Sequence, residues 1–132
     1  PIKVDGFDKG VALNIGNPHI VFYGRSIENI DLNQIGPKIE KHHFFPNKTN
    51  VEFIEVINSN KIKMKVWERG AGVTLACGSG ACAAVYAGWK KKLIENKSEV
   101  QLEKGSLHIN IVDDEAILTG PAEISYNGYI QL

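Results

Sequence analysis

The chain has 132 residues, enough for one ordinary domain and too few for two. Hydrophobic residues make up 43% of it and charged residues 23%, close to the averages of globular proteins, which excludes an intrinsically disordered polypeptide. Lysine plus arginine total 15 and aspartate plus glutamate total 15, so the net charge is zero and we expect neither nucleic acid nor a membrane as a partner.

Two strands and a helix are predicted in the first third of the chain. Residues 11–15 and 19–23 are short apolar runs, each followed by residues typical of turns, and we predict a strand in each. Residues 31–43 carry apolar side chains at helical spacing, and Asp31 is placed to cap the helix. Gly36-Pro37 lies inside this segment, so we expect a broken or two-part helix.

The rest of the chain shows strand patterns on either side of a second helix. Residues 51–57 and 61–67 alternate in polarity and flank turn residues, which predicts a β-hairpin. A helix is predicted over residues 80–96. Four more strands are predicted at residues 100–102, 107–111, 116–118 and 123–126. We therefore expect one α+β domain over residues 1–132.

Cys77 lies directly before the second predicted helix. A helix N-terminus carries a partial positive charge and unpaired N–H groups, and both stabilise a thiolate. A thiol at such a position can titrate well below its free value of about 8.5. Gly78 and Gly80 let a ligand approach the backbone, whose N–H groups can hold a carboxylate. Cys77 is therefore a candidate acid/base, whereas Cys82, among alanines, is expected in the core.

Side chains at the ends of predicted strands are further candidates. Glu68 can accept a proton from a nearby thiol or raise its pKa, and Arg69 offers a bidentate fork for a carboxylate. His19 can shuttle protons, and Asn50 can cap a strand or bind a ligand. A surface ion pair and ordinary structural roles are the alternatives for these residues. No spacing of His, Cys, Asp or Glu indicates a metal site.

The cysteines and the first residues bear on the compartment. Cys77 and Cys82 are five residues apart, unlike a C-x-x-C redox or zinc motif. On one helix their thiols would point about 140° apart, so a disulfide would require the helix to break. Residues 1–5 lack the features of a signal peptide and do not begin with Met. A processed product or a fragment of a longer protein is therefore one interpretation of this chain. We expect reduced thiols and a cytoplasmic location.

A series of motifs occurs in order along nearly the whole chain. They are Gly16-Asn17-Pro18-His19, Phe45-Pro46, Thr49-Asn50-Val51-Glu52-Phe53, Trp67-Glu68-Arg69-Gly70-Ala71-Gly72, Ala76-Cys77-Gly78-Ser79-Gly80-Ala81-Cys82-Ala83, and Leu107 with Leu118-Thr119-Gly120-Pro121-Ala122. Together they resemble the C-terminal half of the diaminopimelate epimerase family. The resemblance implies one half of a pseudo-symmetric fold, with a central helix wrapped by mostly antiparallel strands. Ser79 stands where this family commonly has threonine, which retains the hydroxyl.

The resemblance implies a cofactor-independent epimerase that interconverts LL- and meso-diaminopimelate for lysine and peptidoglycan precursor synthesis. One cysteine comes from each half: a thiolate removes the α-proton and the opposing thiol returns a proton. The catalytic residues implied are Cys77, Glu68, which modulates it, and His19, the counterpart for the other cysteine. The residues implied in substrate binding are Asn17, Asn50, Glu68, Arg69, Gly78 and Ser79.

The sequence holds no second cysteine motif of this family, so the resemblance implies that the N-terminal half is absent and that the isolated chain is inactive. The expected partners are the amino-acid substrate and that missing half. A related amino-acid racemase or phenazine-synthesis-type isomerase is an alternative with the same fold. A second alternative is a non-catalytic module that self-associates, in which a homodimer could bring two Cys77 thiols together.

Overall fold

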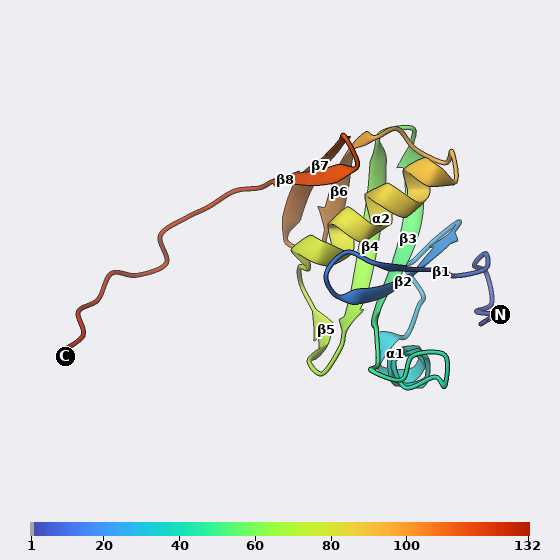
Figure 1. Cartoon of the computed structure of the whole chain (residues 1–132), viewed down its shortest axis with the longest axis horizontal. Coiled ribbons are helices and arrows are strands. Elements are labelled where there is room, and N and C mark those ends of the chain that lie inside the picture. Colours follow the sequence, from blue (N-terminus) through green and yellow to red (C-terminus); the bar gives the residue numbers. More distant parts are fainter. Residues whose placement is uncertain (1) are drawn as a thin grey trace.

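Eight strands form one mixed sheet, and a helix packs against each of its faces (Figure 1). The computed structural model describes residues 2–132. The helices are α1 (Leu32–Glu40) and α2 (Gly78–Lys90). The strands are β1 (Val11–Asn14), β2 (Pro18–Gly24), β3 (Asn50–Asn58), β4 (Lys61–Glu68), β5 (Gly72–Thr74), β6 (Lys97–Leu102), β7 (Gly105–Val112) and β8 (Glu115–Thr119).

Neighbouring strands follow the order β1-β2-β3-β4-β6-β7-β8, and β5 pairs with β4. Five of the seven strand pairs are antiparallel, as predicted, while β2 with β3 and β4 with β6 are parallel. Parallel neighbours need a long crossover, and each of these pairs has a helix in its connection. α1 lies between β2 and β3 in sequence, and α2 lies between β4 and β6.

The alternation of side chains along β2 gives the sheet a core on both faces. Val21 and Tyr23 belong to the cluster that packs on α2, whereas Ile20 and Phe22 belong to the cluster that packs on α1. The Phe22 ring stacks on Phe53 of β3, with ring centroids 5.3 Å apart. A strand buried on both faces is apolar throughout, which explains the continuous run that predicted it.

α2 is the helix around which the strands are arranged. It contacts β1, β2, β3, β6, β7 and β8. Its small side chains are almost all buried, which lets several strands approach the helix closely. The prediction of a central helix wrapped by strands is therefore confirmed. Within residues 2–132, no helix combines the length and the apolar character needed to span a membrane.

The predicted second helix exists, but α2 begins at Gly78, two residues before the predicted start, and ends at Lys90 and not at residue 96. Lys92 adopts a left-handed backbone with φ of +60°, and the Leu93 N–H group bonds back to the Gly88 carbonyl. This geometry is typical of a helix terminus. A left-handed lysine is uncommon, so the early end of the helix left little signal in the sequence.

α1 is continuous, so the predicted break at Gly36-Pro37 is wrong. Asp31 caps the helix as expected, since its side chain accepts the Asn33 N–H group at 3.1 Å. Pro37 removes one backbone donor, which ordinarily weakens a helix. Here the indole of Trp67 packs directly on Gly36, and this tertiary contact favours an unbroken helix.

Four predictions for the rest of the chain are confirmed: the hairpin of β3 and β4, and the strands β6, β7 and β8. Strand β5 was not predicted. The strand predicted at residues 123–126 is wrong. Residues 120–132 form no helix or strand and run away from the body of the domain (Figure 1). A strand needs a neighbouring edge with which to pair, and the tail contacts none.

Candidate active site

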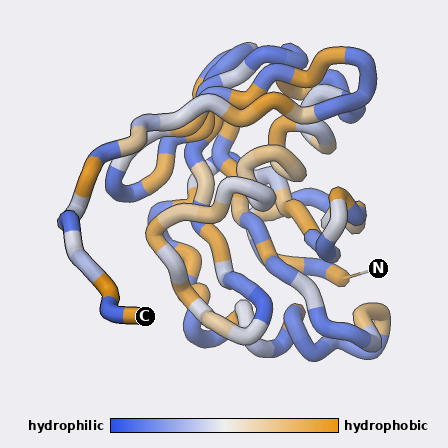
Figure 2. The backbone as a smooth tube through the Cα atoms, turned by 60° about the vertical axis from the view of Figure 1, so that its left-hand side comes forward, coloured by the Kyte–Doolittle hydropathy of each residue, from blue (hydrophilic) through white to orange (hydrophobic). Residues whose placement is uncertain are grey.

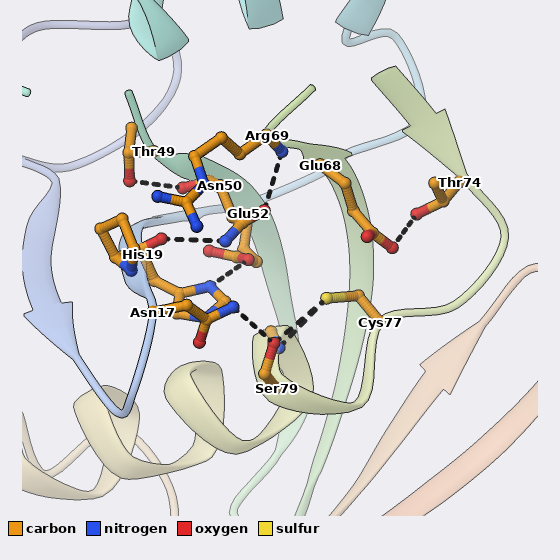
Figure 3. A network of polar contacts seen from close by, with 12 residues as sticks. Asn17, His19, Thr49, Asn50, Glu52, Glu68, Arg69, Thr74, Cys77 and Ser79 are labelled. Atoms are coloured by element: carbon orange, nitrogen blue, oxygen red, sulfur yellow. Dashed lines mark hydrogen bonds and ion pairs between the residues drawn. The ribbon is translucent and has the colours of Figure 1, made fainter. Parts of the chain in front are cut away.

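The predicted site residues meet at the N-terminal end of α2, where strand ends also converge (Figure 3). His19 at the start of β2 pairs in register with Asn50 at the start of β3. Val51 pairs with Trp67 on β4, which places Glu68 at the same edge of the sheet. Residues far apart in sequence thus come together because β2 and β3 are parallel and β4 ends beside their beginnings.

Cys77 is the N-cap residue of α2, and its sulfur lies within the first turn of the helix. Its Sγ accepts the Gly80 N–H group at 3.3 Å and lies 3.6 Å from Ser79 Oγ. Gly78 and Ser79 are the first two helical residues, positions whose N–H groups have no acceptor within a helix. The thiol therefore lies beside N–H groups that can hold a carboxylate, as the sequence predicted.

Burial raises the pKa of the Cys77 thiol above its usual value. The hydrogen bonds from Ser79 and Gly80 lower it, and the nearby carboxyl groups of Glu68 and Glu52 raise it. In the free chain, burial therefore opposes the lowering of the pKa that a helix N-terminus can cause, since the thiol is only 9% exposed. Cys77 and Cys82 are both free, as predicted.

Glu68, the last residue of β4, extends toward Cys77 (Figure 3). Its Oε1 accepts the Thr74 hydroxyl at 2.6 Å, and Thr74 is held by β5, the strand that sequence reasoning missed. None of the hydrogen bonds of residues 2–132 joins Glu68 to the thiol. Glu68 therefore acts on Cys77 through its charge.

His19, Asn17 and Ser79 form one connected chain of polar contacts. His19 Nε2 lies 3.0 Å from Asn17 Oδ1, and Asn17 Nδ2 donates to Ser79 Oγ at 3.2 Å. The His19 ring is 1% exposed, so its partners are fixed by packing. The structure thus links three residues that were predicted separately and connects them through Ser79 to Cys77.

Asn50 and Arg69 lie at the opposite side of the site from α2. Asn50 Oδ1 accepts the Arg69 backbone N–H group at 2.8 Å, and its Nδ2 donates to the Pro18 carbonyl at 3.0 Å. Asn50 therefore joins the ends of three strands and keeps one amide hydrogen for a ligand. The Arg69 side chain is exposed and donates to the Asn47 carbonyl at 3.3 Å, which leaves most of its donors available.

Glu52 is a member of the site that sequence reasoning did not select. It is fully buried, and its Oε1 lies 2.7 Å from His19 Nδ1. The signal that pointed to it was its position on β3, since it shares a face with the apolar Ile54 and Val56. A charged residue on a core-facing position rarely occurs without a partner.

A groove of about 700 Å³ lies elsewhere, between residues 26–33 and the strands β4, β5 and β6. It contains none of the predicted site residues. Among residues 2–132, no three side chains of His, Cys, Asp or Glu gather as metal ligands would.

A family model described as "Diaminopimelate epimerase" matches residues 11–125, and relatives of the same name match the chain over most of its length. This chain belongs to the diaminopimelate epimerase family. The family member from Pelagibacter ubique is 48% identical over 93% of this chain, and the one from Carboxydothermus hydrogenoformans is 51% identical over 89%. The member from Phocaeicola vulgatus is 42% identical over 99%.

The chain spans about half the length of these family members, covering 45%, 43% and 48% of them respectively. Solved structures share the fold at low sequence identity. A phenazine biosynthesis protein of the PhzF family from Enterococcus faecalis superimposes with a TM-score of 0.57 at 12% identity, over 74% of this chain and 35% of that protein. A PhzF-family protein from Bacillus anthracis gives a TM-score of 0.54 at 16% identity, over 85% and 38%. The predicted fold class is thereby confirmed.

Proposed function

We propose that this chain is the C-terminal half of a diaminopimelate epimerase and supplies Cys77 as one of two acid/base residues. The observation that carries the proposal is the placement of Cys77 at the N-cap of α2 in a chain of this family, where its sulfur accepts the Gly80 N–H group in the first turn of the helix. The reaction interconverts LL- and meso-diaminopimelate in lysine and peptidoglycan precursor synthesis. Because both cysteines are free thiols, we assign it to the cytoplasm.

In the proposed reaction, a thiolate on one face of the α-carbon takes the α-proton and becomes a thiol. The electron pair of the broken C–H bond stays on the substrate and spreads into its carboxylate. A thiol on the opposite face gives its proton to the same carbon, which inverts the configuration and leaves a thiolate. The N–H groups of Gly78 and Ser79 stabilise the developing charge on the carboxylate, so the proton transfers need no cofactor.

The protonation state of Cys77 determines the half-reaction in which it starts. Burial raises the pKa of Cys77 and so favours its thiol form, which donates a proton in one direction of the reaction. In that direction the residue that removes the α-proton comes from the other half of the enzyme. After one turnover the roles of the two cysteines are exchanged.

The distal end of the substrate is held by polar groups around the thiol. The exposed guanidinium of Arg69 pairs with the distal carboxylate, a geometry that favours bidentate binding. The amides of Asn17 and Asn50 and the carboxylate of Glu68 complete the polar wall. This arrangement favours a substrate with an amino-acid group at each end.

The C-terminal tail supports the proposal that a partner half completes the enzyme. Its even-numbered residues are apolar or glycine. Figure 2 shows separate orange segments along the tail, with blue and white segments between them. Ile124 is 81% exposed and Tyr126 is 85% exposed, which is unusual for large apolar side chains in an alternating pattern. We assign residues 120–132 to a strand that pairs with a sheet edge of the other half, since the relatives are about twice as long.

The test is a fusion of this chain to the preceding half of the Pelagibacter ubique relative, which is 48% identical to it. Incorporation of deuterium at the α-carbon of LL-diaminopimelate in D₂O is followed by NMR under reducing conditions. We expect exchange in the fusion, its loss in Cys77→Ala, and its retention in Cys82→Ala, which removes a thiol inside α2. The isolated chain should show no exchange.

Other outcomes would point to the alternative functions. Exchange with other amino acids and not with diaminopimelate would favour a related racemase or isomerase. Exchange by the isolated chain, together with a dimeric mass in light scattering, would favour a homodimer with two Cys77 thiols in one site. Retained exchange in Cys77→Ala would refute the assigned role.

A further inference from the structure

Glu52 on β3 is a buried carboxyl group to which the proposed reaction assigns no role. Its side chain is 0% exposed, and its Oε1 lies 2.7 Å from Nδ1 of His19. Its other oxygen, Oε2, is buried without a hydrogen-bond partner among residues 2–132. An ionised carboxylate in this place would leave a charge out of water and a strong acceptor unpaired, which is costly.

The surroundings of Glu52, taken together, disfavour a negative charge on it. Glu52 lies on the sheet face that α2 covers, and the titratable groups around it are His19 and Tyr23 on β2, Glu68 on β4 and Cys77 at the N-terminus of α2. Burial is the largest influence and raises the pKa of the Glu52 carboxyl. The bond with His19 lowers it, and the charge of Glu68 raises it further.

The helix is shaped to admit this carboxyl group. A Cβ atom at Gly80 would lie 2.8 Å from Glu52 Oε1 and 3.1 Å from Cys77 Sγ. Any residue other than glycine at this position would therefore displace the carboxyl group or the thiol. The first turn of α2 thus holds Glu52 and Cys77 close together, both against the same glycine.

The contacts of Asn17 indicate the role of one ring nitrogen of His19. Asn17 Nδ2 donates to Ser79 Oγ, so Asn17 Oδ1 faces His19 Nε2 and accepts its proton at 3.0 Å. A neutral histidine protonated at Nε2 has a bare Nδ1, which accepts a hydrogen bond. A protonated Glu52 supplies this donor through Oε1 and leaves Oε2 as a carbonyl oxygen, which tolerates the absence of a partner better than a carboxylate oxygen does.

We propose that Glu52 is a neutral carboxylic acid at pH 7 and that it starts a chain of hydrogen bonds, all in one direction, that ends on the Cys77 sulfur. Oε1–H donates to His19 Nδ1, His19 Nε2–H donates to Asn17, and Asn17 donates to Ser79. The Ser79 hydroxyl is then left to donate to Cys77 Sγ, 3.6 Å away. Aligned hydrogen bonds strengthen one another, and a donor on the sulfur favours the thiolate.

Glu52 is therefore a positioning residue, which acts on the thiol through His19, Asn17 and Ser79. Its importance for turnover rests on the proposed function, but its protonation and its effect on the thiol do not. Both can be measured on the isolated chain without substrate, so a failure here is distinguishable from a failure of the proposed reaction.

The first measurement is NMR of the wild-type chain at pH 7, with the Glu52 carboxyl carbon and the His19 ring nitrogens assigned. We expect the carbon signal of a protonated carboxyl group and a His19 ring protonated at Nε2 with a bare Nδ1. A carboxylate carbon signal, or a proton on Nδ1, would overturn the proposal.

The second measurement is the pH dependence of Cys77 alkylation by iodoacetamide in a Cys82→Ala background. Glu52→Gln keeps a neutral donor toward Nδ1, so it should retain the wild-type midpoint. Glu52→Leu removes the donor and should move the midpoint to higher pH, as should Ser79→Ala. Glu55→Gln, a matched change on the other face of β3, should leave both the midpoint and the His19 spectrum unchanged.

The glutamine variant decides between a neutral and a charged role for Glu52. If Glu52→Gln shifts the midpoint as Glu52→Leu does, the negative charge is what matters and the proposal is overturned. If Glu52→Leu does not fold, the wild-type spectra and the glutamine variant still decide the question.

Discussion

Gly36→Ala should destabilise the protein, although alanine is the better helix former and Gly36 lies inside α1. A Cβ atom at this position would lie 2.4 Å from Cδ2 and 2.5 Å from Cγ of Trp67. Favourable carbon contacts lie at roughly 3.5–4.0 Å. The Trp67 indole must therefore move by about 1 Å, or α1 must shift away from the sheet.

Three contributions set the size of the effect. Overpacking of this kind costs about 1–3 kcal/mol. A displaced indole also loses its hydrogen bond from Nε1 to Glu40 Oε2, which is 2.8 Å long and of a kind worth about 1.5–3 kcal/mol. The helix preference of alanine offsets about 1 kcal/mol. We expect the free energy of unfolding to fall by about 1.5–5 kcal/mol, a large part of the ~5–15 kcal/mol of a typical domain.

Urea unfolding followed by tryptophan fluorescence measures this change, and the NMR signal of the Trp67 indole N–H group reports its position. Gly105→Ala is the control, because a Cβ atom there meets nothing within 4 Å. It should change the unfolding free energy by no more than about 0.5 kcal/mol. A Gly36→Ala protein as stable as the wild type, with an unmoved indole signal, would refute the reasoning.

Three further predictions concern charge, the thiol and the tail. Hydrogen bonds from Trp67 and Gly70 lower the pKa of Glu40 below its usual 4.5. The free energy of unfolding should therefore decline as the pH falls below 4.5. A Glu40→Gln protein whose unfolding free energy depends on acid pH in the same way would contradict this. Because burial raises the pKa of Cys77, the pH midpoint of its alkylation, followed by mass spectrometry, should lie above the free value of about 8.5. A midpoint below about 8.5 would show that the pKa of this thiol is lowered instead. Replacing Ile124 and Tyr126 together by lysine should change the unfolding free energy of the isolated chain in urea by no more than about 0.5 kcal/mol. The same change should abolish deuterium exchange in the fused enzyme. A destabilised isolated chain would show that the tail packs on this half.

Much of the candidate site could be predicted because its signals are local or occur as ordered motifs. The run of small residues after Cys77 predicted a helix start, since a cap and the first turn involve neighbouring residues only. The ordered motifs placed Asn17, His19 and Glu68 in one site, and the structure brings all three to the end of α2. Glu52 lies within one of these motifs and shares a strand face with apolar residues, but its burial beside His19 depends on where β3 lies in the sheet.

The sequence by itself determined most of the element types, the hairpin, the capping residues and the identity of the polar groups, because these follow from periodicity and from contacts between neighbours. Only the tertiary structure decided that α1 continues through Pro37, where Trp67 packs on the helix. It also brought the burial and the carboxyl groups of Glu68 and Glu52 that raise the pKa of Cys77 in the free chain, and these come from segments distant in sequence. The tail shows the same division: its alternation is local, but a strand forms only where another edge supplies hydrogen-bond partners.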